Sequence, residues 1–111
     1  MDCDGVAFAI LKTETFDKDY VNLERDEQQR VNKILKNLQE QGDTTGKPLR
    51  GLSFFREKKF GGKRVYYLVY KQHLIILVLA VSDKKAQKAT INQILIEIDS
   101  YREYINKMIT N

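Results

Sequence analysis

The chain of 111 residues has room for one domain with one modest hydrophobic core, so we expect a single domain spanning residues 1–111. Charged residues make up 31% of the chain and hydrophobic residues 42%, a balance that excludes a disordered protein. One cysteine, Cys3, and one histidine, His73, cannot form an internal disulfide, a zinc-ligand cluster, or a nucleophilic site of the Cys/His or Ser/His/Asp type. We therefore expect no metal and no cofactor. Any chemistry must use Lys, Arg, Tyr, Asp, Glu or hydroxyl groups.

The net charge of +4 is unevenly distributed along the chain. Residues 44–88 hold eleven lysines and arginines but only two acidic residues, Glu57 and Asp83, which gives this segment a net charge of +9. The remainder of the chain is acidic. Such an asymmetry indicates a polyanionic partner rather than a particular fold.

The N-terminal half predicts a strand followed by two helices. Residues 5–12 are short, apolar and preceded by no basic segment, so we expect a first strand rather than a secretory signal, and a cytoplasmic protein. Thr13 can cap a first helix with Phe16, Tyr20 and Leu23 as its buried positions. Asp26 can cap a second helix that runs to about Gln41 and ends at Gly42. Its apolar stripe consists of Val31, Ile34, Leu35 and Leu38.

The C-terminal half predicts three strands and a helix. The strand-like runs cover residues 52–59, 63–71 and 73–82, with Gly61-Gly62 as a hairpin turn between the first two. The third run is apolar from Leu74 to Val81, too short for a membrane span of roughly 20 residues, so we expect a central strand covered on both faces. A last helix begins between Lys84 and Lys88. Its predicted buried positions are Ile91, Ile94, Leu95, Ile98, Tyr101, Ile105 and Met108.

This order of elements, βααβββα, predicts an α+β fold. An antiparallel meander of strands forms the sheet, the first two helices cover one of its faces as a hairpin, and a helix ends the chain.

Strand periodicity places cations and tyrosines on the expected sheet surface. Arg56 and Lys58 are two residues apart in one strand and therefore point the same way. In the next strand Val65 and Val69 suit the face covered by helices, which would turn Arg64, Tyr66 and Tyr70 outward. Cations bind phosphates and aromatic rings stack on unpaired bases, so this surface favours single-stranded RNA.

Structural explanations compete with each of these functional ones. Exposed lysines such as Lys59, Lys63 and Lys71 often serve only to prevent edge-to-edge aggregation. Tyrosines in strands commonly pack in a core or across strands. Asp83, beside Lys84 and Lys85, is best interpreted as a local cap or salt-bridge partner, and His73 as a turn residue.

Several short stretches, taken with the order of elements, resemble a known superfamily. They are GKPLRGL from Gly46, FFREKKFGGKRVYYLVY from Phe54, and an apolar strand that ends in VSDKK. Over about Phe8 to Lys88 the chain resembles the RelE/ParE superfamily of type II toxin–antitoxin toxins. The passage from VSDKKAQKA to SYREYI is closest to the RelE and HigB-like branches.

The resemblance implies an mRNA endoribonuclease, which we expect to be ribosome-associated. In such enzymes an RNA 2′-hydroxyl attacks the adjacent phosphate to give a 2′,3′-cyclic phosphate, without a metal. By position, the resemblance implies catalytic roles for Arg56, Lys58, Arg64 and Lys84. The implied RNA-binding residues are Lys47, Arg50, Lys59, Lys63, Tyr66, Tyr70 and Lys85.

The identity of the base stays open at this point. The best-known RelE branch has a tyrosine near its C-terminus, where this chain reads QKAT, with no tyrosine before Tyr101. Lys58 is crowded by other cations, which lowers the pKa of a lysine, so it is our hypothesis for the base.

Two alternatives remain beside the endoribonuclease: a ParE-like inhibitor of DNA gyrase and a non-catalytic RNA-binding homologue. The resemblance also implies partners. These are mRNA, the ribosome, and a cognate antitoxin that is acidic and partly disordered; we expect no membrane partner.

Overall fold

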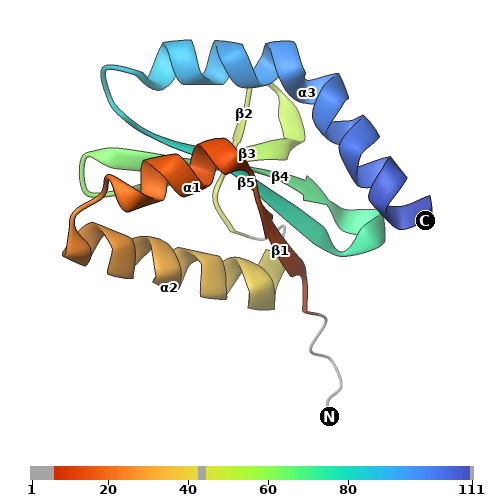
Figure 1. Ribbon diagram of the computed structural model, residues 1–111, viewed down its shortest axis with the longest axis horizontal. Helices are drawn as coiled ribbons and strands as arrows, with labels where there is room; N and C mark the ends of the chain where they lie inside the picture. The colour runs from red at the N-terminus through yellow and green to blue at the C-terminus, as the bar shows by residue number, and fades with distance from the viewer. Residues whose placement is uncertain (1–6, 43–44, 111) are drawn as a thin grey trace.

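The computed structural model describes residues 7–42 and 45–110, and Figure 1 shows its elements around one mixed sheet. In chain order the elements are β1 (Ala9–Lys12), α1 (Glu14–Val21), α2 (Arg25–Gln41), β2 (Lys47–Leu49), β3 (Leu52–Phe60), β4 (Lys63–Tyr70), a 3₁₀ turn (Lys71–His73), β5 (Ile75–Asp83) and α3 (Gln87–Thr110). The sheet order is β1-β5-β4-β3-β2. The predicted α+β class, the helical pair and the C-terminal helix are confirmed, and β2 is an additional short strand.

The sheet is antiparallel except at one edge. β3, β4 and β5 form the predicted meander, and β2 pairs antiparallel with β3. β1 pairs with β5 in parallel, with Ala9 opposite Ile75 and Lys12 opposite Val78. β5 therefore lies inside the sheet, as its continuous apolar sequence predicts.

The two N-terminal helices start at different kinds of cap. Thr13 caps α1 as predicted, because its Oγ1 accepts a 3.0 Å hydrogen bond from the Phe16 amide. The predicted Asp26 cap of α2 is wrong. Glu24 is the cap, and its own amide donates a 3.0 Å hydrogen bond to the Glu27 carboxylate. This reciprocal capping box satisfies two otherwise free amides and starts the helix earlier.

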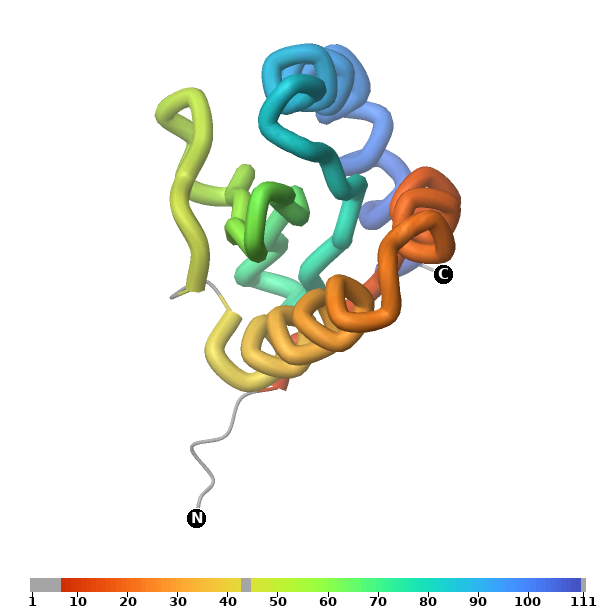
Figure 2. Tube along the Cα trace, turned by 90° about the vertical axis from the view of Figure 1, so that its left-hand side faces the viewer, coloured from red at the N-terminus to blue at the C-terminus, as the bar shows by residue number. Residues whose placement is uncertain are grey.

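Helices cover both faces of the sheet. Figure 2 shows α2 below the strands, α3 above them, and α1 at the β1–β5 edge between the two. On the α1/α2 face, Phe16, Val31 and Leu38 pack against Val65 and Tyr67. The face under α3 has its own core. It joins Leu49, Phe55, Tyr66, Leu68, Leu77, Leu79, Ala80, Ile91, Ile94 and Ile105.

The C-terminal helix departs from its predicted stripe at one end. Ile91, Ile94 and Ile105 are buried, whereas Met108 is 43% exposed because the helix continues past its last buried contact. No helix among the described residues is long and apolar enough to cross a membrane.

Candidate functional site

The register of the β3–β4 hairpin decides which cations share a surface. Gly61 and Gly62 form a two-residue turn, so Phe60 pairs with Lys63, Lys59 with Arg64, and Glu57 with Tyr66. Directly opposed residues of antiparallel strands point to the same face. Arg64 therefore shares the α3 face with Lys59 and Glu57.

The predicted common surface of Arg56, Lys58 and Arg64 is wrong. Arg56 is opposite Tyr67, and Lys58 is opposite Val65, which places both on the α1/α2 face. The alternation within each strand is as predicted, but the register between the two strands differs by one residue from the expected one. A shift of one residue moves every side chain to the other face.

Arg64 and Glu57 form a buried ion pair at the end of the α3 face. The Arg64 Nε atom lies 3.8 Å from Glu57 Oε1. Arg64 is only 8% exposed and Glu57 3%. Within the described part of the chain, the buried Nε has no hydrogen-bond partner. A buried guanidinium without a full set of acceptors is costly unless an anion completes it.

Three further side chains surround this pair, and we call the five together the Arg64 cluster: Glu57, Arg64, Tyr66, Ser82 and Gln87. Gln87, the first residue of α3, donates from Nε2 to Glu57 Oε1 at 3.4 Å. The Tyr66 hydroxyl and Ser82 Oγ are 2.7 Å apart, and Ser82 also donates to the Asp83 carbonyl. Burial raises the pKa of Tyr66 and outweighs the opposing effect of its hydrogen bond with Ser82, so the phenol stays protonated.

Exposed lysines lie around the Arg64 cluster. Lys47 pairs with Glu57 across β2 and β3, and Lys59 pairs with Arg64, so both belong to the α3 face. Lys84 and Lys85 occupy the turn between β5 and α3. Asp83 Oδ1 accepts a 2.8 Å bond from the Ala86 amide, which fixes this turn and confirms the predicted local cap. The cluster is thus a buried cation and anion within a positive rim.

Several predicted site residues have other contacts. The Arg56 guanidinium donates to the backbone carbonyls of Ser53 and Gly46, at 2.9 and 3.0 Å, and so holds the entry to β2. Lys63 is paired with Glu27 of α2 at 3.1 Å. Arg50 donates to Asn92 of α3 at 3.2 Å.

The predicted outward tyrosines are also corrected. Tyr66 is completely buried beneath α3, so its ring offers no face for stacking on a base. Tyr70 is partly buried against the same core, and burial raises its pKa to about 12. The α3 helix covers the surface that these rings were expected to form.

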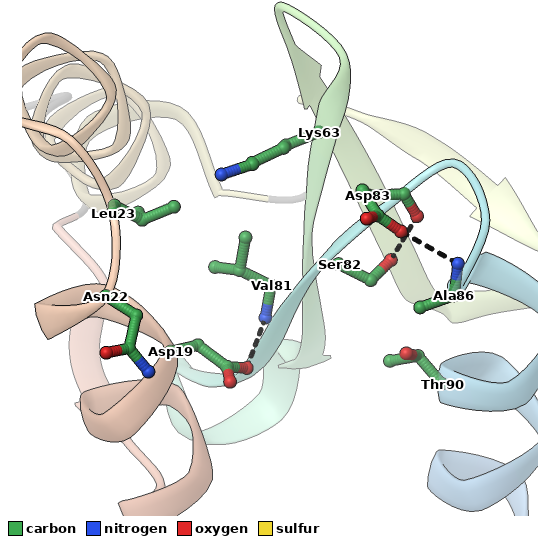
Figure 3. A pocket seen from close by; sticks show the side chains of 9 residues that line it. All are labelled: Asp19, Asn22, Leu23, Lys63, Val81, Ser82, Asp83, Ala86 and Thr90. Carbon is green, nitrogen blue, oxygen red and sulfur yellow. Dashed lines mark hydrogen bonds between the residues drawn. The ribbon is translucent and has the colours of Figure 1, made fainter.

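A separate hollow of about 270 Å³ lies beside the Arg64 cluster, between α1 and the start of α3. Figure 3 shows Lys63 and Asp83 at its rim, with Asp19 bound to the Val81 amide at 2.9 Å. Ser82 lines this hollow and also contacts Tyr66, whereas Arg64 does not line it. The buried Arg64 Nε without a hydrogen-bond partner points to a ligand more specifically than the hollow does.

Solved structures of similar shape come from toxins. A double mutant of the E. coli toxin RelE in its free state matches with a TM-score of 0.66 and 21% identity, over 75% of this chain and 90% of that chain. The RelBE2 toxin–antitoxin complex from Mycobacterium tuberculosis matches with a TM-score of 0.62 and 22% identity, over 71% of this chain and 100% of that one. This chain has the RelE fold.

The RelE fold also appears in an archaeal RelE–RelB complex from Pyrococcus horikoshii, at a TM-score of 0.62 and 15% identity, over 71% of this chain and 97% of that one. Neither the protein-family models nor the curated proteins give a match by sequence. The likeness is therefore one of structure, which the predicted resemblance to RelE-like toxins anticipated.

Glu57 is the residue that sequence reasoning missed. In the sequence it is one of two acidic residues within a basic segment. The Gly61-Gly62 turn would have revealed its position, because a two-residue turn pairs Lys59 with Arg64. Glu57 lies two residues before Lys59 and therefore on the same face of the sheet as Arg64.

Proposed function

We propose that this chain is the toxin of a type II toxin–antitoxin system, a single-domain endoribonuclease that cleaves mRNA at the ribosome. The RelE fold supports the toxin assignment at the level of architecture. One observation carries the site: the buried Arg64 Nε, which lacks an acceptor within the described residues and lies beside exposed lysines.

A phosphodiester supplies what Arg64 lacks. Its non-bridging oxygens accept hydrogen bonds from a guanidinium in a planar geometry that Arg matches better than Lys. In the proposed cleavage, the 2′-hydroxyl attacks phosphorus and negative charge grows on those oxygens. Each preorganised donor of this kind contributes roughly 3–4 kcal/mol to transition-state stabilisation in other enzymes.

The lysines of the rim have a supporting role in this proposal. Lys47, Lys59, Lys84 and Lys85 are exposed and surround the cluster, so they bind the RNA backbone on either side of the cleaved phosphate. This binding is sequence-independent and weakens with salt. Lys58 lies on the other face of the sheet, away from Arg64, and so is not placed to act as the base.

We also propose a cognate antitoxin as a partner. Two of the similar structures are complexes of RelE-type toxins with their antitoxins. The net charge of +9 on residues 44–88 favours an acidic segment as the inhibitor of this surface. Co-purification of the tagged chain with the product of the neighbouring reading frame tests the pairing.

The function is tested by inducing the chain in cells and mapping the 5′ ends of transcripts. An endoribonuclease gives new ends within coding regions, with cyclic phosphates on the upstream fragments. Intact mRNA together with DNA damage would instead indicate a gyrase poison. Intact mRNA and normal growth would indicate a non-catalytic homologue.

A further inference from the structure

We propose that the Glu57 carboxylate is the proton acceptor for the attacking 2′-hydroxyl in the Arg64 cluster. This inference rests on the proposed function and adds the residue that the reaction lacks. The cluster holds one carboxylate, and it lies on the same sheet face as the cation proposed to bind the phosphate.

The geometry supports a base next to a phosphate site. At 3.8 Å, Glu57 Oε1 and Arg64 Nε are too far apart for a full hydrogen bond. Arg64 Nε can therefore still donate to a ligand, and Glu57 Oε1 can still accept from one. A phosphate oxygen at Arg64 would bring the adjacent ribose to the Glu57 side. General bases act over hydrogen-bond distances of about 2.6–3.2 Å, which this proximity allows.

Gln87 positions the carboxylate and covers it. Its Nε2 atom donates to the same Oε1 at 3.4 Å, a long bond from the first residue of α3. The contact orients Glu57 while the site is empty, and its length makes displacement by a ribose hydroxyl inexpensive. The burial of Glu57 excludes water, which strengthens electrostatic interactions in the cluster.

The charged side chains that share the sheet face of Glu57 are cations. Arg64 of β4 is the near cation, and Lys47 of β2 and Lys59 of β3 lie on the same face. Tyr66 of β4 stays neutral, and Asp83 lies at the end of β5.

The proton balance of the step is complete. Glu57 takes the 2′-hydroxyl proton as the 2′-oxygen forms its bond to phosphorus. The bond from phosphorus to the 5′-oxygen then breaks, and that oxygen leaves with the electron pair and takes a proton from water. Glu57 returns its proton to solvent, and Arg64 holds the non-bridging oxygens throughout.

The test uses purified full-length protein and a reporter mRNA on purified ribosomes, with the cleavage position mapped first for the native chain. Glu57→Gln keeps the size of the side chain and an acceptor for Gln87 but cannot take the proton. We expect its cleavage rate to fall by about 10²–10⁴-fold, the usual contribution of a general base. Glu103→Gln, an exposed change on α3, is the matched control and should cleave at the native rate.

One further measurement separates catalysis from folding. Binding of the same mRNA with a 2′-deoxynucleotide at the cleavage position should be unchanged in Glu57→Gln, because the variant retains Arg64 and the lysines.

The outcomes distinguish the two proposals. If the native protein does not cut the mRNA at all, the proposed function fails. If Arg64→Ala abolishes cutting while Glu57→Gln cuts at the native rate, the nuclease proposal stands and Glu57 serves only as the charge partner of Arg64.

Discussion

The Nε atom of Arg64 lies 3.8 Å from Oε1 of Glu57, and both side chains are buried where β3 and β4 meet α3. An ion pair in this position costs desolvation for both charges, and its geometry leaves the Nε atom without an acceptor. We therefore explain the pair by a ligand that accepts a hydrogen bond from Arg64 Nε, and not by a contribution to the stability of the fold.

This reasoning predicts the stability of two variants. Arg64→Met leaves Glu57 as an unpaired buried charge and should lower the free energy of unfolding by about 3–5 kcal/mol. The double variant Arg64→Met/Glu57→Leu removes both charges and should recover most of that loss. Urea unfolding measures both values. A double variant as unstable as Arg64→Met would mean that the pair itself stabilises the fold.

Arg56 should prove structural rather than catalytic. Its guanidinium binds the carbonyls of Ser53 and Gly46 and thereby anchors β2 to β3. Arg56→Ala should lower the unfolding free energy by roughly 2 kcal/mol, since hydrogen bonds to charged groups contribute about 1.5–3 kcal/mol. Below its melting temperature the variant should cleave RNA at the native rate. A cleavage loss as large as that of Arg64→Ala, in a folded variant, would restore the original catalytic assignment.

Gly46 should tolerate no side chain. Its φ is 83°, and an added Cβ would lie 2.9 Å from the Glu57 carbonyl oxygen and still closer to the Tyr67 hydroxyl. Gly46→Ala should therefore cost more than the roughly 1–2 kcal/mol of a positive φ alone. Gly51→Ala is the matched control, because its φ is 72° but no atom lies within 4 Å of the added Cβ. Thermal unfolding should rank Gly46→Ala well below Gly51→Ala, and equal losses would contradict the close contact.

Alkaline pH should destabilise the protein through Tyr67. Burial raises its pKa to about 12, and its hydroxyl donates to the Thr45 carbonyl at 2.6 Å. The unfolded chain loses the phenolic proton near pH 10, so between about pH 10 and pH 12 the folded state binds more protons and stability falls as pH rises. Tyr67→Phe should lose about 1 kcal/mol at neutral pH and show a shallower alkaline decline. An unchanged decline would assign the effect to other groups.

The sequence predicted most of the architecture because its signals were local. The Thr13 cap, the stripe from Val31 to Leu38 and the apolar run of β5 each depend on a few neighbouring residues, and each is confirmed. The parallel pairing of β1 with β5 and the short strand β2 are contacts between distant segments, which local periodicity does not encode.

The site was harder to predict than the fold, for a related reason. The sequence indicates Arg64 as a candidate, but the residues around it depend on the hairpin register and on which helix covers the sheet. Because of the register, the residues that share a face with Arg64 are Lys59 and Glu57, not Arg56 and Lys58. The α3 helix then buries Tyr66 and brings Gln87 to the cluster, and neither effect follows from strand periodicity alone.

The central claim is that Arg64 binds the phosphate of an RNA strand that the chain cuts. Transcript ends mapped after induction of the native chain and of Arg64→Ala, at matched soluble levels, test it most directly. We predict new 5′ ends within coding regions for the native chain and none for Arg64→Ala. The same ends at the same frequency in both would contradict the account.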